Sequence, residues 1–153
     1  MSTLRALAHL EEQLGPARWH ELIDSANTGK VKALCDELLI PTTMVVGGRT
    51  YDILSVEGNI GSGHELVCLA QELDAHLGRE ERMHLLDHQQ EIPSLLGKIK
   101  IIFTDDTSAD DAHGSITSIE WDKGCRQWTC FWCRLDSTII YRGRNIRVLR
   151  RRS

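Results

Sequence analysis

The first forty residues carry apolar side chains at the spacing of amphipathic helices. Leucines recur at intervals of three and four at the start of the chain, which predicts a helix that Gly15 and Pro16 end before another begins. Two more helices are predicted over 19–26 and 31–39, the last one stopping before Pro41. Because each helix has one apolar face, all of them need a surface to pack on.

From Thr42 onward the apolar period changes from that of helices to that of strands. Residues 43–46 and 50–54 are typical of a β-hairpin, and the two-residue turn between them would contain Gly47 and Gly48. Glycine adopts positive φ at little cost, which is what this turn requires. The sheet of the protein is therefore predicted to begin here.

Two helices are predicted after the hairpin. Ser62 and Glu65 form a capping box at the start of the first helix, whose apolar residues run from 66 to 77. Gly78 should end this helix. A second helical segment is predicted over 80–90.

The rest of the chain alternates between strand-forming segments and polar turns. Strands are predicted over 98–103, 116–121, 128–135 and 138–149. Four strands in a row favour an antiparallel meander at the C-terminus. The predicted fold class is therefore α+β, with short N-terminal helices and a mainly antiparallel sheet covered by helices.

Length and composition are those of one ordinary soluble domain. A chain of 153 residues suffices for a single domain over 1–153, and the change of period leaves open a helical subdomain over 1–40 and an α+β core over 42–153. No apolar run approaches the ~20 residues of a membrane span, and Glu11 and Glu12 interrupt any signal peptide. Five cysteines favour free thiols over a disulfide framework. We expect a cytoplasmic protein without a membrane.

Charge is distributed unevenly along the chain. Residues 142–153 contain six of the eighteen Lys and Arg residues and no Asp or Glu. This segment has a formal charge of +6, so the other 141 residues carry −10 of the overall −4. Such asymmetry indicates a basic contact surface on an acidic protein.

The arginines of this basic end divide between the two faces of a predicted strand. Residues of one parity are Arg142, Arg144, Arg150 and Arg152, whereas Arg147 and Arg151 have the other parity. Trp128 and Trp132 share a face of the preceding strand. The guanidinium group suits phosphates and carboxylates, so a protein partner and a nucleic acid are both open. Internal pairing with the acidic body is a further alternative.

A cluster of cysteines could hold a metal only with unusual geometry. Cys125, Cys130 and Cys133 fall close together, with His113 as the nearest fourth ligand for zinc. In a strand, however, Cys130 and Cys133 would point to opposite faces. We therefore expect ordinary strand cysteines and no metal.

Four other patterns are incomplete as chemical or binding motifs. His84 and His88 have the spacing of a metalloprotease helix, but Leu85 stands where its glutamate belongs. The loop Gly58–Gly63 precedes a helix, as a phosphate-binding loop would, but its glycines lack the order of either nucleotide motif. Asp105, Asp106, Asp110 and Asp111 lack the register of a calcium loop. Lys30 and Lys32 at the start of a helix suggest a helix-turn-helix only superficially.

Several short runs resemble a loose set of small uncharacterised bacterial proteins. They are AHLG at 75–78, HLLDHQ at 84–89 with EIP at 91–93, FTD at 103–105 and RVLRR at 147–151. The resemblance covers about the last two-thirds of the chain. It implies a recurring unit, with no activity, fold or ligand attached to it.

Without a complete catalytic motif, the sequence favours a non-enzymatic interaction protein without a cofactor. The predicted partner-binding residues are Arg142, Arg144, Arg147, Arg150, Arg151, Trp128 and Trp132. The expected partner is an acidic protein or another anionic molecule. Nucleic-acid binding is the first alternative, and an enzyme or nucleotide binder that uses the loop Gly58–Gly63 is the second.

Overall fold

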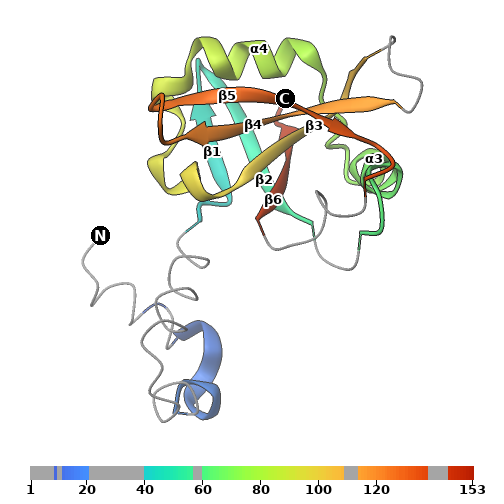
Figure 1. Cartoon of the computed structure of the whole chain (residues 1–153). Coiled ribbons are helices and arrows are strands. Elements are labelled where there is room, and N and C mark those ends of the chain that lie inside the picture. Colours follow the sequence, from blue (N-terminus) through green and yellow to red (C-terminus); the bar gives the residue numbers. More distant parts are fainter. Residues whose placement is uncertain (1–8, 10–11, 21–39, 57–59, 109–113, 138–144) are drawn as a thin grey trace. The chain divides into compact units, whose positions relative to one another are not determined.

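The computed structural model describes residue 9 and residues 12–20, 40–56, 60–108, 114–137 and 145–153 (Figure 1). The chain divides into two compact units, Met1–Pro41 and Thr42–Ser153. In the first unit, residues 12–20 are helical, and Gly15 has a φ of +73° just before Pro16. This left-handed residue lies where the sequence predicts a break between helices. The helices predicted over residues 21–39 lie outside the described residues.

Within the described part of the second unit, six strands form one mixed sheet in the order β1-β2-β6-β3-β4-β5 (Figure 1). The strands are β1 (Thr43–Val46), β2 (Arg49–Ser55), β3 (Lys100–Thr107), β4 (Ser115–Asp122), β5 (Gln127–Arg134) and β6 (Ile146–Arg151). The helices are α3 (Gly63–Glu72) and α4 (Arg79–Asp87), with the 3₁₀ turns η1 (Gln89–Glu91) and η2 (Ser94–Lys98). The α+β class and the mostly antiparallel sheet are confirmed.

The last strand does not continue the predicted meander. β3, β4 and β5 do follow one another as antiparallel neighbours, but β6 lies between β2 and β3. It runs antiparallel to β2 and parallel to β3. All four residues from Ile146 to Leu149 are buried, as expected for a central strand covered on both faces. The prediction of a four-strand meander is therefore wrong in its last strand.

The β1–β2 hairpin forms as the sequence predicts. Gly47 and Gly48 have φ values of +54° and +76°, which are those of a two-residue turn with both central residues left-handed. The strands pair from Val46 with Arg49 outward. His84 of α4 holds this turn, because its Nε2 lies 2.9 Å from the carbonyl oxygen of Val46.

Helix α3 begins where the capping box predicts and ends earlier than expected. The Ser62 side chain accepts a hydrogen bond from Glu65 N at 3.4 Å, and Glu65 Oε2 accepts one from Gly61 N at 2.7 Å. The helix ends at Glu72, because Asp74 takes a φ of +55° and the next N–H reaches back to the Ala70 oxygen at 2.7 Å. Gly78 therefore does not end α3; it is the N-cap of α4.

Helices cover the two faces of the sheet. Leu66 and Ala70 of α3 belong to a core cluster with Ile102, Ile116 and Val148. Residues on the opposite face alternate with these, and α4 lies over that face, where its residue Glu81 contacts Tyr51 of β2. The central strands are thus buried on both sides.

The two turn glycines provide a matched pair for testing this packing. A Cβ on Gly47 would lie 2.6 Å from Cε1 and Nε2 of His84, whereas a Cβ on Gly48 would meet nothing within 4 Å. Gly48→Ala should cost about 1–2 kcal/mol, the penalty of left-handed backbone alone. Gly47→Ala should cost about 1–3 kcal/mol more, because the His84 contact must also break. Urea unfolding monitored by circular dichroism measures both, and equal losses would contradict the packing.

Candidate functional site

Two arginines of the basic end share a carboxylate on one face of the sheet. Arg150 donates from Nε and Nη2 to Oδ2 of Asp52 at 3.1 and 3.0 Å, and Arg152 donates from Nε to Oδ1 at 2.8 Å. Hydrogen bonds from Arg152 and then from Arg150 hold the pKa of Asp52 below its ordinary value of 3.8. Both cations therefore have a counter-ion within the protein.

A second cluster forms around Glu81 of α4. Its carboxylate accepts hydrogen bonds from Tyr51 at 2.5 Å, Arg49 at 3.1 Å and Arg151 at 2.8 Å. Burial alone would raise the pKa of Glu81, but these donors outweigh burial and lower the pKa below its ordinary value of 4.5. Burial, followed by the bond to Glu81, raises the pKa of Tyr51 and keeps its hydroxyl a neutral donor.

The arginines therefore do not gather in one patch. Arg150 and Arg152 lie on the face opposite that of Arg151, in agreement with strand parity. Arg147 is only 6% exposed, and its Nη1 donates to the Ile146 oxygen at 2.9 Å. The prediction that Arg147 contacts a partner is wrong, because a buried guanidinium group cannot reach a partner molecule. Arg142 and Arg144 lie outside the described residues.

The two tryptophans predicted for the same surface have different environments. Trp128 is 4% exposed and packs edge-to-face against Trp121, with ring centroids 6.2 Å apart. The prediction that Trp128 belongs to a partner-binding surface is also wrong, because its side chain is buried. Trp132 is 58% exposed and its neighbour Phe131 is 42% exposed. Because adjacent residues of a strand point to opposite faces, these two rings flank β5 on both sides.

β5 is an edge strand whose outer main-chain groups are available. The N–H of Trp128 points away from β4, because it donates to Oε1 of Gln89 at 2.8 Å. Main-chain groups alternate between the two sides of an antiparallel strand. The N–H and C=O groups of Cys130 and Trp132 therefore also point outward, and they have no partner among the described residues.

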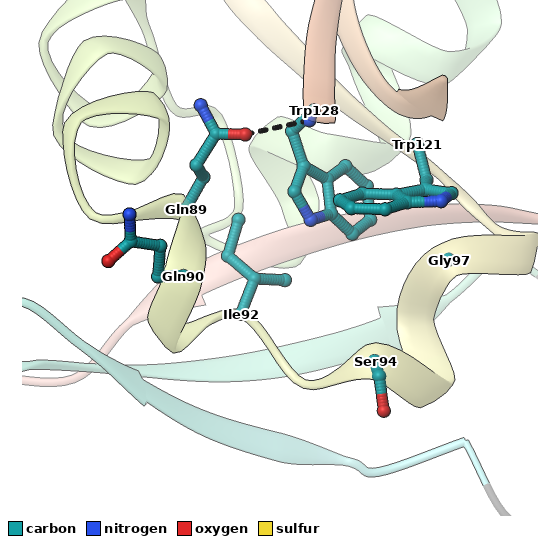
Figure 2. A pocket seen from close by; sticks show the side chains of 7 residues that line it. All are labelled: Gln89, Gln90, Ile92, Ser94, Gly97, Trp121 and Trp128. Atoms are coloured by element: carbon teal, nitrogen blue, oxygen red, sulfur yellow. Dashed lines mark hydrogen bonds between the residues drawn. The ribbon is translucent and has the colours of Figure 1, made fainter. Parts of the chain in front are cut away.

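A pocket of about 340 Å³ lies beside the start of β5 (Figure 2). It lies between the indoles of the Trp121–Trp128 pair and the segment of η1 and η2. The lining residues are Gln89, Gln90, Ile92, Ser94, Gly97, Trp121 and Trp128. Sequence reasoning missed this pocket. The pairing of Trp121 and Trp128 across a short hairpin can be predicted from the sequence. No local pattern, however, predicts that Gln89 and Gln90 lie beside them.

The cysteines do not converge. Cys133 is buried with its sulfur 3.4 Å from the Ser118 hydroxyl, Cys125 is exposed, and Cys130 lies on the other face from Cys133. Burial raises the pKa of the Cys130 thiol, which favours its protonated form. Within the described residues no group of three or more His, Cys, Asp or Glu side chains could hold a metal ion. His113 lies outside these residues.

The two spaced histidines have structural partners. His88 Nδ1 lies 2.9 Å from the main-chain oxygen of His84, and the two rings are 4.5 Å apart. His84 Nε2 contacts the Val46 oxygen, as described above. The pair therefore joins α4 to the β1–β2 turn.

The glycine loop and the acidic segment are also occupied by internal contacts. Gly61 N donates to the carboxylate of Glu65, which places a negative charge where a phosphate would bind. Residues 57–59 of the loop lie outside the described ones. Asp106 is buried in β3, where it accepts hydrogen bonds from Arg82 and Thr117. The segment from Asp105 is therefore not all loop: β3 extends to Thr107. Asp110 and Asp111 are not described.

Comparisons with protein-family models, with curated proteins and with solved structures find no match to this chain. None of the helices in the described part of the chain combines the length and apolar character needed to cross a membrane. The function of the candidate site is therefore inferred from its geometry alone.

Acid titration tests the Glu81 and Asp52 clusters. Both carboxylates have a lowered pKa in the folded protein, so their stabilisation is fully present above about pH 5 and is lost as pH falls through the folded-state pKa values. Glu81→Gln should lower the free energy of unfolding at neutral pH by about 2–4 kcal/mol and flatten its fall in acid. Urea unfolding across this pH range measures both effects.

Glu80, the neighbour of Glu81 in the sequence, supplies the control substitution. Glu80 is 78% exposed and pairs with Arg49 at 3.2 Å. Glu80→Gln should cost at most about 1 kcal/mol, as expected for an exposed ion pair. Equal losses of unfolding free energy in Glu81→Gln and Glu80→Gln would contradict the stabilising role of the Glu81 cluster.

Proposed function

We propose that this protein is a non-enzymatic interaction protein that binds an extended, acidic segment of another protein along the outer edge of β5. The observation that carries the proposal is the pair of exposed rings on this edge strand, Trp132 and Phe131. Exposed aromatic side chains are typical anchors of protein interfaces. The contact surface is thus narrower than the arginine-rich end that the sequence indicates.

The main chain of β5 supports strand addition as the binding mode. Cys130 and Trp132 each present an N–H and a C=O away from β4. An extended segment laid against them would form regular β-sheet hydrogen bonds, and alternate side chains would supply the selectivity. Trp132 on one face and Phe131 on the other would each pack against a side chain of the added strand.

β5 lacks the features that usually protect an edge strand. Such strands are normally guarded by charges, prolines or bulges that hinder pairing with other chains. From Gln127 to Cys133 the strand has no charged residue and no proline, and it pairs with β4 in unbroken register. A strand of this kind would promote aggregation if it remained uncovered, which favours a partner that covers it.

Two cations beside β5 favour an acidic partner. Lys123 and Arg126 lie in the β4–β5 turn, are exposed, and form no ion pair within the described residues. At the other end of the strand Arg134 pairs with Asp136 at 2.9 Å. The C-terminal arginines Arg150 and Arg151, by contrast, already pair with carboxylates. Charge complementarity thus lies beside the aromatic edge itself.

A peptide selection tests the proposal. Random linear peptides displayed on phage would be selected on the full protein, and the affinity of enriched peptides measured by fluorescence polarisation. We expect peptides rich in Asp and Glu. Cys130→Pro removes one outward N–H and should weaken binding about tenfold or more, whereas Cys130→Ala keeps that N–H and should bind like the wild type.

A charge substitution gives an independent check of the same site. Trp132→Glu keeps every main-chain group, removes an exposed ring that the core does not need and repels an acidic peptide, so the fold should persist while peptide affinity falls. Equal affinity of all variants would refute strand addition. Light scattering that shows a dimer for wild type and Cys130→Ala but a monomer for Cys130→Pro would identify a second copy as the occupant. Selective capture of single-stranded nucleic acid instead of peptides would also overturn the proposal.

A further inference from the structure

The pocket beside the start of β5 has the size and lining of a small-molecule site. Its volume of about 340 Å³ falls at the lower end of the range for ligand pockets, roughly 300–1,000 Å³. Its lining combines two indole rings with the side chains of two glutamines, an isoleucine and a serine. None of the lining residues is ionisable, so a charged ligand would lie there without a counter-ion.

One polar group that faces this pocket has no hydrogen-bond partner in the described part of the chain. Trp128 is 4% exposed, and its main-chain N–H is satisfied by Gln89. Its indole Nε1–H has no hydrogen-bond acceptor within the described part of the chain. Figure 2 shows this nitrogen directed into the pocket, on the side of Ile92. This donor is therefore available to a ligand atom in the pocket.

The other walls define the shape and the remaining contacts. Trp121 stands at 70° to Trp128 and is 37% exposed, which leaves part of its ring open to a ligand. The Gln90 amide can both donate and accept, and the Ser94 hydroxyl can do the same. Both residues are exposed and line the pocket. The walls therefore suit a flat ring with polar atoms at its edge.

We propose that this pocket binds a small, uncharged heteroaromatic ring whose ring nitrogen or carbonyl oxygen accepts the indole N–H of Trp128. The ring would pack against Trp121, and the Gln90 amide would contact its outer edge. This site is independent of strand addition at β5, because its ligand contacts side chains of the pocket and not the outer main-chain groups of the strand.

Two bicyclic probes of one shape test the assignment. Benzimidazole has a ring nitrogen that accepts a hydrogen bond, whereas indole has the same frame without this acceptor. At mildly alkaline pH, where benzimidazole is neutral, it should bind about three- to tenfold more tightly than indole, the difference that one hydrogen bond supplies. Titration followed by ¹⁵N–¹H spectra should shift the indole N–H resonance of Trp128 and leave that of Trp132 in place.

Substitutions within the pocket decide the role of the donor. Trp128→Phe keeps an aromatic ring but removes the N–H, so the preference for benzimidazole should disappear, while Trp132→Phe outside the pocket should retain it. Gly97→Leu offers a second test, because a Cβ at Gly97 meets Trp121 at an ordinary 3.6 Å and the longer side chain would fill the pocket. Binding of both probes should then be lost. Absence of saturable binding to the wild type, equal affinity for the two probes, or unchanged binding by Gly97→Leu would each overturn the proposal.

Discussion

The position of β6 between β2 and β3 is the constraint on which the rest of the structure depends. Among the described strands, the β1–β2 hairpin and the β3–β4–β5 meander share no pairing with each other, and β6 joins them into one sheet. A two-stranded hairpin is at best marginally stable by itself. The burial of Ile146 through Leu149 on both faces thus stabilises the hairpin, the meander and the helices over them together.

The same placement determines what the basic end can do. The register of β6 on β2 sets Arg151 opposite Tyr51 and Arg150 opposite Asp52, so alternate arginines face carboxylates on opposite sides of the sheet. Arg150 and Arg151 belong to the basic end of the sequence, but in the fold nearby carboxylates balance their charges. Cations without such partners lie elsewhere, at Lys123 and Arg126 beside the exposed rings of β5.

Local signals in the sequence predicted local structure well. The Gly47–Gly48 turn and the capping box at Ser62 are confirmed, because each depends on residues within a few positions of one another. Strand parity also correctly predicted that Arg151 lies on the face opposite that of Arg150 and Arg152. The path of β6 was missed because the buried Arg147 interrupts an apolar run that would otherwise read as a central strand. The pocket could not be found either, since its contact between Gln89 and Trp128 spans 39 positions.

Trp128 also governs how the two proposed sites relate. Its main-chain N–H lies on the outer edge of β5, and its ring forms a wall of the pocket. Because the Gln89 side chain already accepts that N–H, an added strand would pair with β5 from Cys130 onward and leave the pocket entrance uncovered. Gln89 thus ends the available edge at the point where the pocket begins. The two sites can therefore be occupied together, and a ligand that displaced Gln89 would lengthen the edge by one hydrogen-bonding position.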